Sequence, residues 1–353
     1  MTGVPHIRTR LSRTGEMVRF RPDLGDFRRI PLFSAVRGTQ TLELINSTPP
    51  PEAPHLTREL FTDEELVAFK AAQRLAFDAV VAIEAELHEG ITEQQAAGKL
   101  ERWLRARGVS HFFHYGFVWF GDRTRFRDFP PLPRRARDLL ESKTARGSGT
   151  YRPSGRRLAH GDAVILDVGP IHRGGAADIG HSCTLGEPTE EFHETRMALA
   201  AFRPMILELV RKGDTQARID KAVDEYTRDH GYVNIHSMYP GSAIAHRVGR
   251  VPGLRLPTFN VKGFSPQTVG YLAGDIVGSA LRLDVRSAPF WKPKSDRPCE
   301  PGLWAFEPHI GRGEVGAKWG EVLVVTEDTA YWLDDDLPHV RYWADHGVAQ
   351  DLS

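Results

Sequence analysis

A repeat of two helix pairs, 123 residues apart, is the sequence feature that most constrains the fold of this chain. The first pair lies in "FTDEELVAFKAAQRLAFDAVVAIEAELHEG" and "ITEQQAAGKLERWLRARGV", where Gly90 and Gly108 are placed to end the helices. Gly213 and Gly231, each 123 residues further on, end two more helical patterns. Strand-like segments follow each pair. We therefore predict an internal duplication of helix, helix and strands, in which a site between the halves draws side chains from both.

Local signals predict where these helices begin. Thr62 with Glu65, and Thr92 with Gln95, have the spacing of capping boxes, in which the two side chains bond each other's backbone. In the second half, "EPTEEFHETRMALAAFRPMILELVRKG" predicts one long helix, and "DTQARIDKAVDEYTRDHGYV" predicts a shorter one.

The charge balance excludes some classes of function. Lys and Arg together number 46, as do Asp and Glu, whereas a general binder of nucleic acid or anionic membranes normally has a basic excess. No stretch resembles a signal peptide or an apolar run of ~20 residues, so we expect a soluble protein. Two cysteines, Cys183 and Cys299, are too few for a disulfide framework and form no CxxC zinc pattern. These features favour a reducing, cytoplasmic setting.

Composition divides the chain into two parts. Residues 1–56 read as an N-terminal arm that ends in a Pro-rich linker, "TPPPEAP", and residues 57–353 as a catalytic domain. The arm either contributes little or lines the rim of a site or a dimer contact. Two loop-like stretches, 125–154 and 250–278, interrupt the domain and are either functional or locally mobile.

Two aspartates interrupt apolar stretches in "VILDVGPIHRGGAADIGHS". Asp167 lies in a run typical of a buried strand, and Asp178 follows eleven residues later. The proline and paired glycines between them favour a turn, so a hairpin would place the two carboxylates side by side. Burial and like charge would then raise the pKa of one carboxyl group, a conflict that a bound cation removes. Alternatively, each aspartate lies at a strand end, solvated or paired with a neighbour such as Arg173.

Three further side chains of ligand type accompany predicted strands of the second half. Glu307 lies in "GLWAFEPHIG", Glu321 precedes the apolar run in "KWGEVLVVTEDTAYWL", and His246 follows a small apolar run in "SAIAHRVG". Together with the two aspartates they form an oxygen-rich set with one imidazole and no thiolate. Such a set suits two divalent metal ions of the Mn, Co, Zn or Fe type.

The order of these residues resembles that of the M24 metallopeptidases of pita-bread fold. The matching elements are "DVG", the eleven-residue step to "AD", "HxxG", "EP" and a closing Glu before "VLVVTED". The family includes methionine aminopeptidases, aminopeptidase P, prolidase and the metal-free creatinases. The resemblance covers residues 57 to about 335. It implies an α+β fold in which helix-helix-strand units, related by a pseudo-twofold axis, surround a curved antiparallel sheet.

The resemblance also implies a role for each ligand. Asp167 would be a bidentate ligand of one metal, and Asp178 and Glu321 would bridge both ions. His246 would bind one ion and Glu307 the other. A metal-bridging water or hydroxide would attack the scissile carbonyl while Glu307 helps to move its proton.

The sequence departs from the family pattern near the site. Arg286, in "LDVRSAPFW", stands where the family usually carries a second histidine; it cannot accept a proton but could hold an anionic substrate group. A rival alignment puts Ser279 at the histidine-ligand position, and we prefer His246 because "HRVG" matches "HxxG". His309, directly after "EP", and His236 are candidates to contact substrate or support the ligands, and we include His309 and Arg286 among the catalytic residues.

Histidines elsewhere have weaker claims. His111, His114 and His160 could replace polar residues that the family places in its first half, but a lone histidine is more often structural. His172 and His181 flank the aspartate pair, and the sequence does not decide whether they face the metals or the solvent.

The resemblance implies a metallohydrolase that cleaves an amide bond near the N-terminus of a small peptide or amino-acid-derived substrate. A dinuclear Xaa-Pro aminopeptidase or dipeptidase, active as a homodimer, is the leading hypothesis, with no role for nucleic acid or membrane. One alternative is a creatinase-like hydrolase or lyase of a non-peptide small molecule. Another is a pita-bread protein that only binds a partner.

Overall fold

The fold comes from a computed structural model, which describes residues 61–127, 151–239, 243–251, 263–266, 268–270, 273 and 290–350. The predicted arm and linker, most of both long loops, Ser279 and Arg286 lie outside the described residues.

The first helix pair begins where the capping signals predict. Helix α1 (Asp63–Glu84) and helix α2 (Glu93–Arg105) follow complete capping boxes at Thr62 and Thr92. Gly90 and Gly108 have φ angles of 84° and 89°, the left-handed region that glycine adopts without strain. Gly90 does not end α1 directly, because the helix stops at Glu84 and a short turn follows.

The second helix pair contains a break that we did not predict. The expected long helix is divided into α4 (Glu190–Ala198), a 3-10 turn η4 (Leu199–Ala201) and α5 (Phe202–Arg211). Pro204 lies three residues beyond the end of this turn, and a proline has no N–H to bond the carbonyl four residues earlier, so a continuous helix is disfavoured there. Helix α6 (Gln216–Asp229) follows as expected.

Antiparallel strands form three small sheets. In the first, β2 pairs with β1, β3 and β4; the second has the order β11-β10-β7-β6; and the third has the order β5-β8-β9. The strands are β1 (His111–Phe120), β2 (Ala163–His172), β3 (Gly175–Ala176), β4 (Ile179–Thr184), β5 (Val233–Asn234), β6 (Ala245–Val248), β7 (Gly302–Phe306), β8 (His309–Arg312), β9 (Val315–Lys318), β10 (Glu321–Val325) and β11 (Ala330–Trp332).

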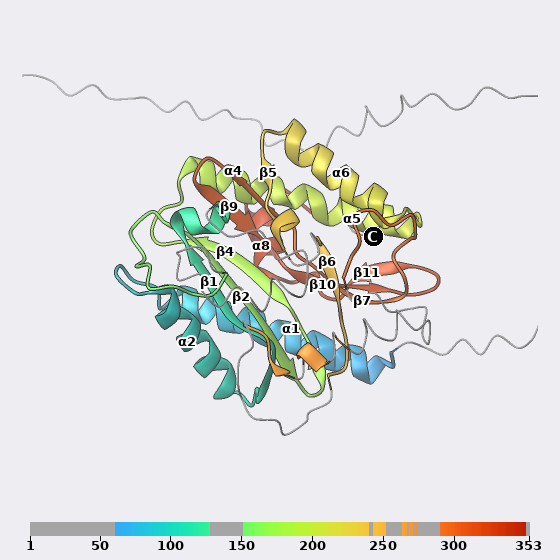
Figure 1. Ribbon diagram of the computed structural model, residues 1–353, viewed down its shortest axis with the longest axis horizontal. Helices are drawn as coiled ribbons and strands as arrows, with labels where there is room; N and C mark the ends of the chain where they lie inside the picture. Colours follow the sequence, from blue (N-terminus) through green and yellow to red (C-terminus); the bar gives the residue numbers. More distant parts are fainter. Residues whose placement is uncertain are drawn as a thin grey trace, which may run out of the picture.

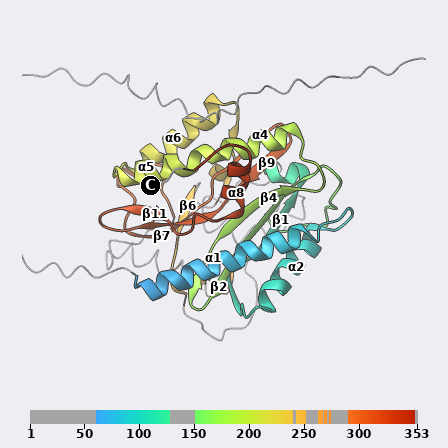
Figure 2. The ribbon, with the colours of Figure 1, turned by 180° about the vertical axis from the view of Figure 1, so that it is seen from behind.

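Helices cover the strands from the outside (Figure 1). Seen from behind, α1 crosses the molecule in front of β2, with α2 beside it, while α4, α5 and α6 lie on the opposite side (Figure 2). Three short helical elements complete the described fold: η2 (Gly121–Arg125), η5 (His236–Met238) and α8 (Pro338–Asp345). The α+β arrangement and its duplicated helix pairs therefore agree with the prediction.

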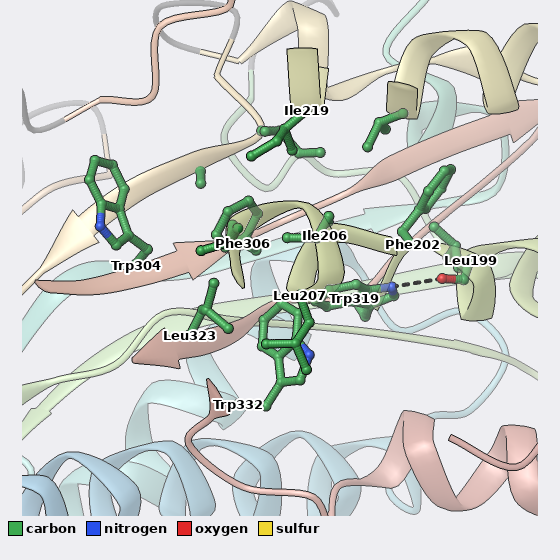
Figure 3. Packing of buried hydrophobic residues seen from close by; sticks show 14 of the residues in the cluster. Leu199, Phe202, Ile206, Leu207, Ile219, Trp304, Phe306, Trp319, Leu323 and Trp332 are labelled. Atoms are coloured by element: carbon green, nitrogen blue, oxygen red, sulfur yellow. Dashed lines mark hydrogen bonds between the residues drawn. The ribbon is translucent and has the colours of Figure 1, made fainter. Parts of the chain in front are cut away.

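Aromatic side chains fill the core of the second half. Trp304, Phe306 and Trp332 pack against α5 and α6, and the indole N–H of Trp319 donates to the Leu199 carbonyl at 3.2 Å (Figure 3). This bond satisfies a buried donor at the break between α4 and α5. The core thus fixes the end of β9 against the helix layer.

Two smaller observations bear on the setting of the protein. Cys183 and Cys299 are buried free thiols. Among the described residues, no helix has the length and apolar character needed to cross a membrane.

Candidate active site

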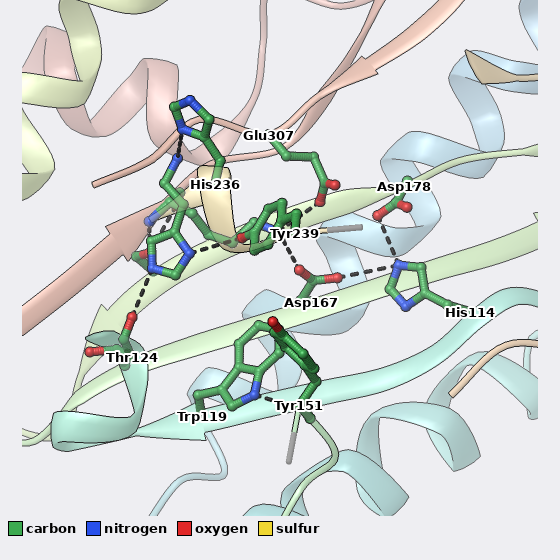
Figure 4. A network of polar contacts seen from close by, with 12 residues as sticks. His114, Trp119, Thr124, Tyr151, Asp167, Asp178, His236, Tyr239 and Glu307 are labelled. Atoms are coloured by element: carbon green, nitrogen blue, oxygen red, sulfur yellow. Dashed lines mark hydrogen bonds and ion pairs between the residues drawn. The ribbon is translucent and has the colours of Figure 1, made fainter. Parts of the chain in front are cut away.

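The two aspartates meet in a hairpin, as predicted. Strand β2 pairs with β4 so that Asp167 lies opposite Gly180, and both carboxylates are 3% exposed. His114, on neighbouring β1, joins them: its Nε2 lies 2.8 Å from Asp178 Oδ1 and 3.3 Å from Asp167 Oδ1. In Figure 4 the aspartates and His114 point toward one another, His114 from β1, Asp167 from β2 and Asp178 from the residue just before β4.

The second half contributes His246 and Glu307 to the same cluster. His246 Nε2, on β6, lies 2.9 Å from Asp178 Oδ2 and 3.7 Å from Glu307 Oε2. Strand β7, which ends just before Glu307, pairs with β6 so that Ala305 lies opposite His246. The predicted meeting of side chains from the two halves is therefore present for these four residues.

Lys318, which we did not predict, lies inside the cluster at the end of β9. Its Nζ donates to Asp167 Oδ2 and, at 2.7 Å, to Glu307 Oε1, while the residue is 2% exposed. The Tyr239 ring lies 5.1 Å from the ammonium nitrogen. A lysine inside the otherwise apolar run "VGAKW" was the available sequence signal, because such a lysine must be paired if it is buried.

The pKa values show how the cluster balances its charges. Burial would raise the pKa of Asp178, but His114 and His246 outweigh it and hold that pKa well below its usual range. Burial would lower the pKa of His114, yet Asp178 and Asp167 raise it to about 9. For Asp167, burial raises the pKa to about 6 against the opposing charges of Lys318 and His114. Asp178 and His114 thus favour each other's charged forms, whereas at Asp167 burial outweighs the cationic partners.

Glu321 requires a correction, because the structure does not bring it into the cluster. Arg203 binds both of its carboxylate oxygens, at 2.6 and 3.2 Å, and His339 Nε2 lies 3.1 Å from one of them. The reason is strand alternation. Glu321 lies opposite Phe306, which packs into the core of Figure 3. The face of the sheet that carries Ala305 of β7 and His246 of β6 is the other one.

Gly320 occupies the position that faces the cluster by the same alternation. Gly320 precedes Glu321 and follows Lys318 by two residues. Because residues two apart in an extended chain share a face, Gly320 and Lys318 lie on the same face. A Cβ at Gly320 would lie 2.6 Å from the backbone nitrogen of Gly180, so no side chain fits there without backbone movement. Glu321, the expected fifth ligand, therefore lies one residue after the position that faces the cluster.

His309 and His236 lie beside the cluster without joining it. His309 is fully buried, with Nδ1 2.8 Å from the Tyr239 hydroxyl and Nε2 2.8 Å from the Thr124 carbonyl oxygen. Its backbone N–H donates to His236 Nδ1 at 3.4 Å, and burial lowers the pKa of His236 to about 3. His309 thus bonds the hydroxyl of Tyr239, whose ring lies beside the Lys318 ammonium, and His236 bonds the backbone of His309.

The structure also places the remaining histidines. His181 Nε2 lies 2.7 Å from a carboxylate oxygen of Glu84 in α1. His181 follows Gly180, the strand partner of Asp167, so its side chain lies on the face of the sheet opposite to Asp167. His172 ends β2 beside the turn. Among the histidines of the first half, only His114 is grouped with Asp167 and Asp178 within the described part of the chain.

Three groups of side chains in the described residues have donor atoms close enough to hold a metal ion. Two share the cluster: His114 with Asp167 and Asp178, and Asp178 with His246 and Glu307. The third, Glu84 with His181 and Cys183, lies on the α1 side. The nitrogen and oxygen donors of the cluster are of the kind that divalent ions of the transition series prefer. Within the same region, Lys318 binds Asp167 and Glu307, and Arg203 binds Glu321.

Relatives of known structure share this fold. The X-Pro aminopeptidase of Thermotoga maritima superposes with a TM-score of 0.54 at 20% identity, covering 79% of this chain and 63% of that one. Methionine aminopeptidase from Rickettsia prowazekii gives 0.51 at 13% identity, covering 78% of this chain and 98% of that one. These likenesses confirm the pita-bread fold.

Sequence comparison identifies the family. The Xaa-Pro dipeptidase of Pyrococcus furiosus is 22% identical over 203 residues, which are 56% of this chain and 49% of that protein. The chain thus spans about half the length of the curated relatives it matches. The model of metallopeptidase family M24 matches residues 67–327, and the chain therefore belongs to this family.

Proposed function

We propose that this chain hydrolyses an amide bond in a small peptide or amino-acid derivative at the cluster of Asp167, Asp178, His246 and Glu307. The observation that carries the proposal is their convergence from both halves of the fold into one buried site, joined by His114. Buried carboxylates and imidazoles with strongly shifted pKa values are typical of catalytic sites.

A single divalent ion of the Mn, Co, Zn or Fe type is the metal content that these donors support. Asp178, His246 and Glu307 would hold it, because their ligand atoms already face one another. When bound, the ion would polarise the scissile carbonyl as a Lewis acid. The dinuclear arrangement expected from the resemblance is less well supported, because it needs Glu321, which binds Arg203.

The chain's own residues account for orientation and proton transfer. Glu307 and His246 are each 9% exposed, against 3% for the aspartates, so we propose that substrate approaches from their side. Glu307 would accept the proton of the attacking water and pass it to the leaving nitrogen, while His246 Nε2 would stay on the metal. Lys318 holds Glu307 in place, because its ammonium donates to Glu307 Oε1 at 2.7 Å.

The substrate class has two candidates. An Xaa-Pro dipeptide or peptide is supported by the curated relative, an Xaa-Pro dipeptidase. A non-peptide amide is supported by the buried Lys318, because the resemblance to creatinases implies that this fold can hydrolyse small molecules without two metals. In either case Arg286, outside the described residues, stays a candidate for holding an anionic substrate group.

The test is a hydrolysis assay with Mn²⁺ on Xaa-Pro dipeptides, N-terminal Xaa-Pro peptides and a panel of small amides. Asp178→Asn should lower kcat/KM by ~10²-fold or more, since it removes the charge shared by both histidines. Asp229→Asn, on the surface of α6 with its side chain 64% exposed, is the matched control and should leave kcat/KM unchanged. Cleavage of small amides alone would favour the creatinase-like candidate. A folded protein that cleaves no substrate would favour a binding protein.

Two further features of the hypothesis stay predictions. A cytoplasmic location agrees with the two buried free thiols, which persist in a reducing compartment. A homodimer is expected from the resemblance, and sedimentation or light scattering of the purified chain would test it.

A further inference from the structure

We infer that Lys318 takes the place of one of the two metal ions of a dinuclear site, so that this chain binds at most one divalent ion at the cluster. The inference concerns the same site and rests on the proposed function only in placing a metal there.

The contacts of Lys318 are those of a bridging cation. Its ammonium binds one oxygen of Asp167, from the first half, and one oxygen of Glu307, from the second. The residue is 2% exposed, so water cannot replace these partners. An ammonium has three donors and no acceptor, so it satisfies acidic oxygens much as a metal ion would. Two carboxylates that would repel each other are therefore joined by a cation that belongs to the chain.

The lysine side chain needs a glycine beside it on the neighbouring strand. Gly180, opposite Asp167 on β4, faces the aliphatic stem of Lys318. A Cβ at Gly180 would collide with Lys318 Cε and lie 3.0 Å from its Cδ. The hairpin that positions both aspartates thus carries a glycine where any side chain would displace the lysine.

The charges of the cluster leave room for one ion only. Asp167, Asp178 and Glu307 bring three negative charges, and Lys318 returns one positive charge. One divalent ion would neutralise the remaining two charges even with both histidines uncharged. A second divalent ion would leave an excess of two positive charges in a buried site, which is strongly unfavourable.

The second ion also lacks its ligand. Glu321, expected to bridge two ions, has both oxygens on Arg203, and neither residue is exposed. The site-facing position beside it is Gly320, where a side chain would meet the Gly180 backbone. The positions of Lys318, Gly320 and Glu321 therefore all argue against a second metal ion.

Metal content gives the most direct test. The full chain would be stripped with a chelator, loaded with Mn²⁺ alone, freed of excess metal and assayed for Mn per chain, with thermal unfolding recorded with and without Mn²⁺. We expect no more than one equivalent of Mn per chain. In Lys318→Met, which leaves Asp167 and Glu307 facing each other without a cation, Mn²⁺ should raise Tm by about 5 °C more than in the unaltered chain.

Lys212→Met is the matched control, because Lys212 pairs with Glu208 on the exposed surface of α5 and should give the unaltered response. Two equivalents of Mn in the unaltered chain would overturn the inference, as would equal Tm shifts in Lys318→Met and the control. If Lys318→Met does not fold, a double variant with Lys318→Met and Asp167→Asn removes one positive and one negative charge, and it should fold without metal. Failure of this double variant to fold would count against the charge argument. Hydrolysis with two ions would refute this inference alone, whereas one ion without any hydrolysis would refute only the proposed function.

Discussion

Replacing Arg203 by methionine should destabilise the protein without changing its metal content. Arg203 and Glu321 form an ion pair in which both side chains are fully buried. Methionine has a similar length but no charge, so Arg203→Met leaves the Glu321 carboxylate with His339 as its remaining partner, at 3.1 Å. The variant also removes the bond from Arg203 to the Asp334 carbonyl at 3.0 Å.

The expected loss is large because a buried charge would lose its main counter-ion. Breaking a buried pair by removing one partner costs about 3–5 kcal/mol, and the remaining His339 favours the lower end, ~3 kcal/mol. That is a substantial part of a total stability of about 5–15 kcal/mol. For a domain of this size, Tm should fall by roughly 6–12 °C.

Thermal and urea unfolding of Arg203→Met, together with metal analysis, is the assay. Arg341→Met is the matched control, because Arg341 pairs with Asp336 on the surface and its loss should cost about 1 kcal/mol or less. Suppose instead that Arg203→Met lost its bound metal while its Tm stayed within about 2 °C of the unaltered chain, well below the expected shift. Glu321 would then be acting as a metal ligand. Our assignment of Glu321 to the core would then be wrong.

Three further predictions concern packing, titration and helix capping. Gly180→Ala should cost about 1–3 kcal/mol in urea unfolding, because its methyl group meets the Lys318 stem; Gly155→Ala, with open space around it, is the control, and equal stabilities would contradict the account. Burial and Asp224 raise the pKa of Asp220 to about 7 from 3.8, so its ionised form destabilises the fold above pH 7 and the effect disappears below about pH 4. Asp220→Asn should therefore raise Tm at pH 8 and leave it unchanged at pH 4, and the same shift at both pH values would argue against it. Thr92→Ala should lower the free energy of unfolding by about 1 kcal/mol by removing the capping bond to Gln95, which Thr92→Ser should retain.

Local signals in the sequence predicted the parts of the fold that depend on neighbours along the chain. The capping boxes at Thr62 and Thr92 depend on a spacing of three residues and were confirmed. The hairpin that joins Asp167 to Asp178 depends on the turn between them, and it was confirmed as well. The break between α4 and α5 could have been predicted from Pro204, had we given the proline more weight than the apolar periodicity.

The errors arose where strand register decides which face a side chain takes. Glu321 has the right chemistry for a ligand and lies next to the right position, but alternation turns it toward Arg203. Lys318 and Gly320 lie on the site-facing side instead, since residues two apart in an extended chain share a face. A pattern of residue types alone does not carry that information.

His114 could be considered from the sequence but not chosen. It lies in the aromatic strand "HFFHYGFVWF", where several residues had equal claims. Its role depends on the pairing of β1 with β2, which places it next to Gly169 and within reach of both aspartates. That pairing joins residues far apart in sequence, and a single sequence does not specify its register.

Anomalous diffraction from crystals soaked in Mn²⁺ would test the central claim most directly. The account predicts at most one Mn peak, among Asp178, His246 and Glu307, with the Lys318 ammonium still between Asp167 and Glu307 and with Glu321 bound to Arg203. Two Mn peaks at the cluster, with Lys318 displaced and Glu321 turned toward the metal, would contradict it.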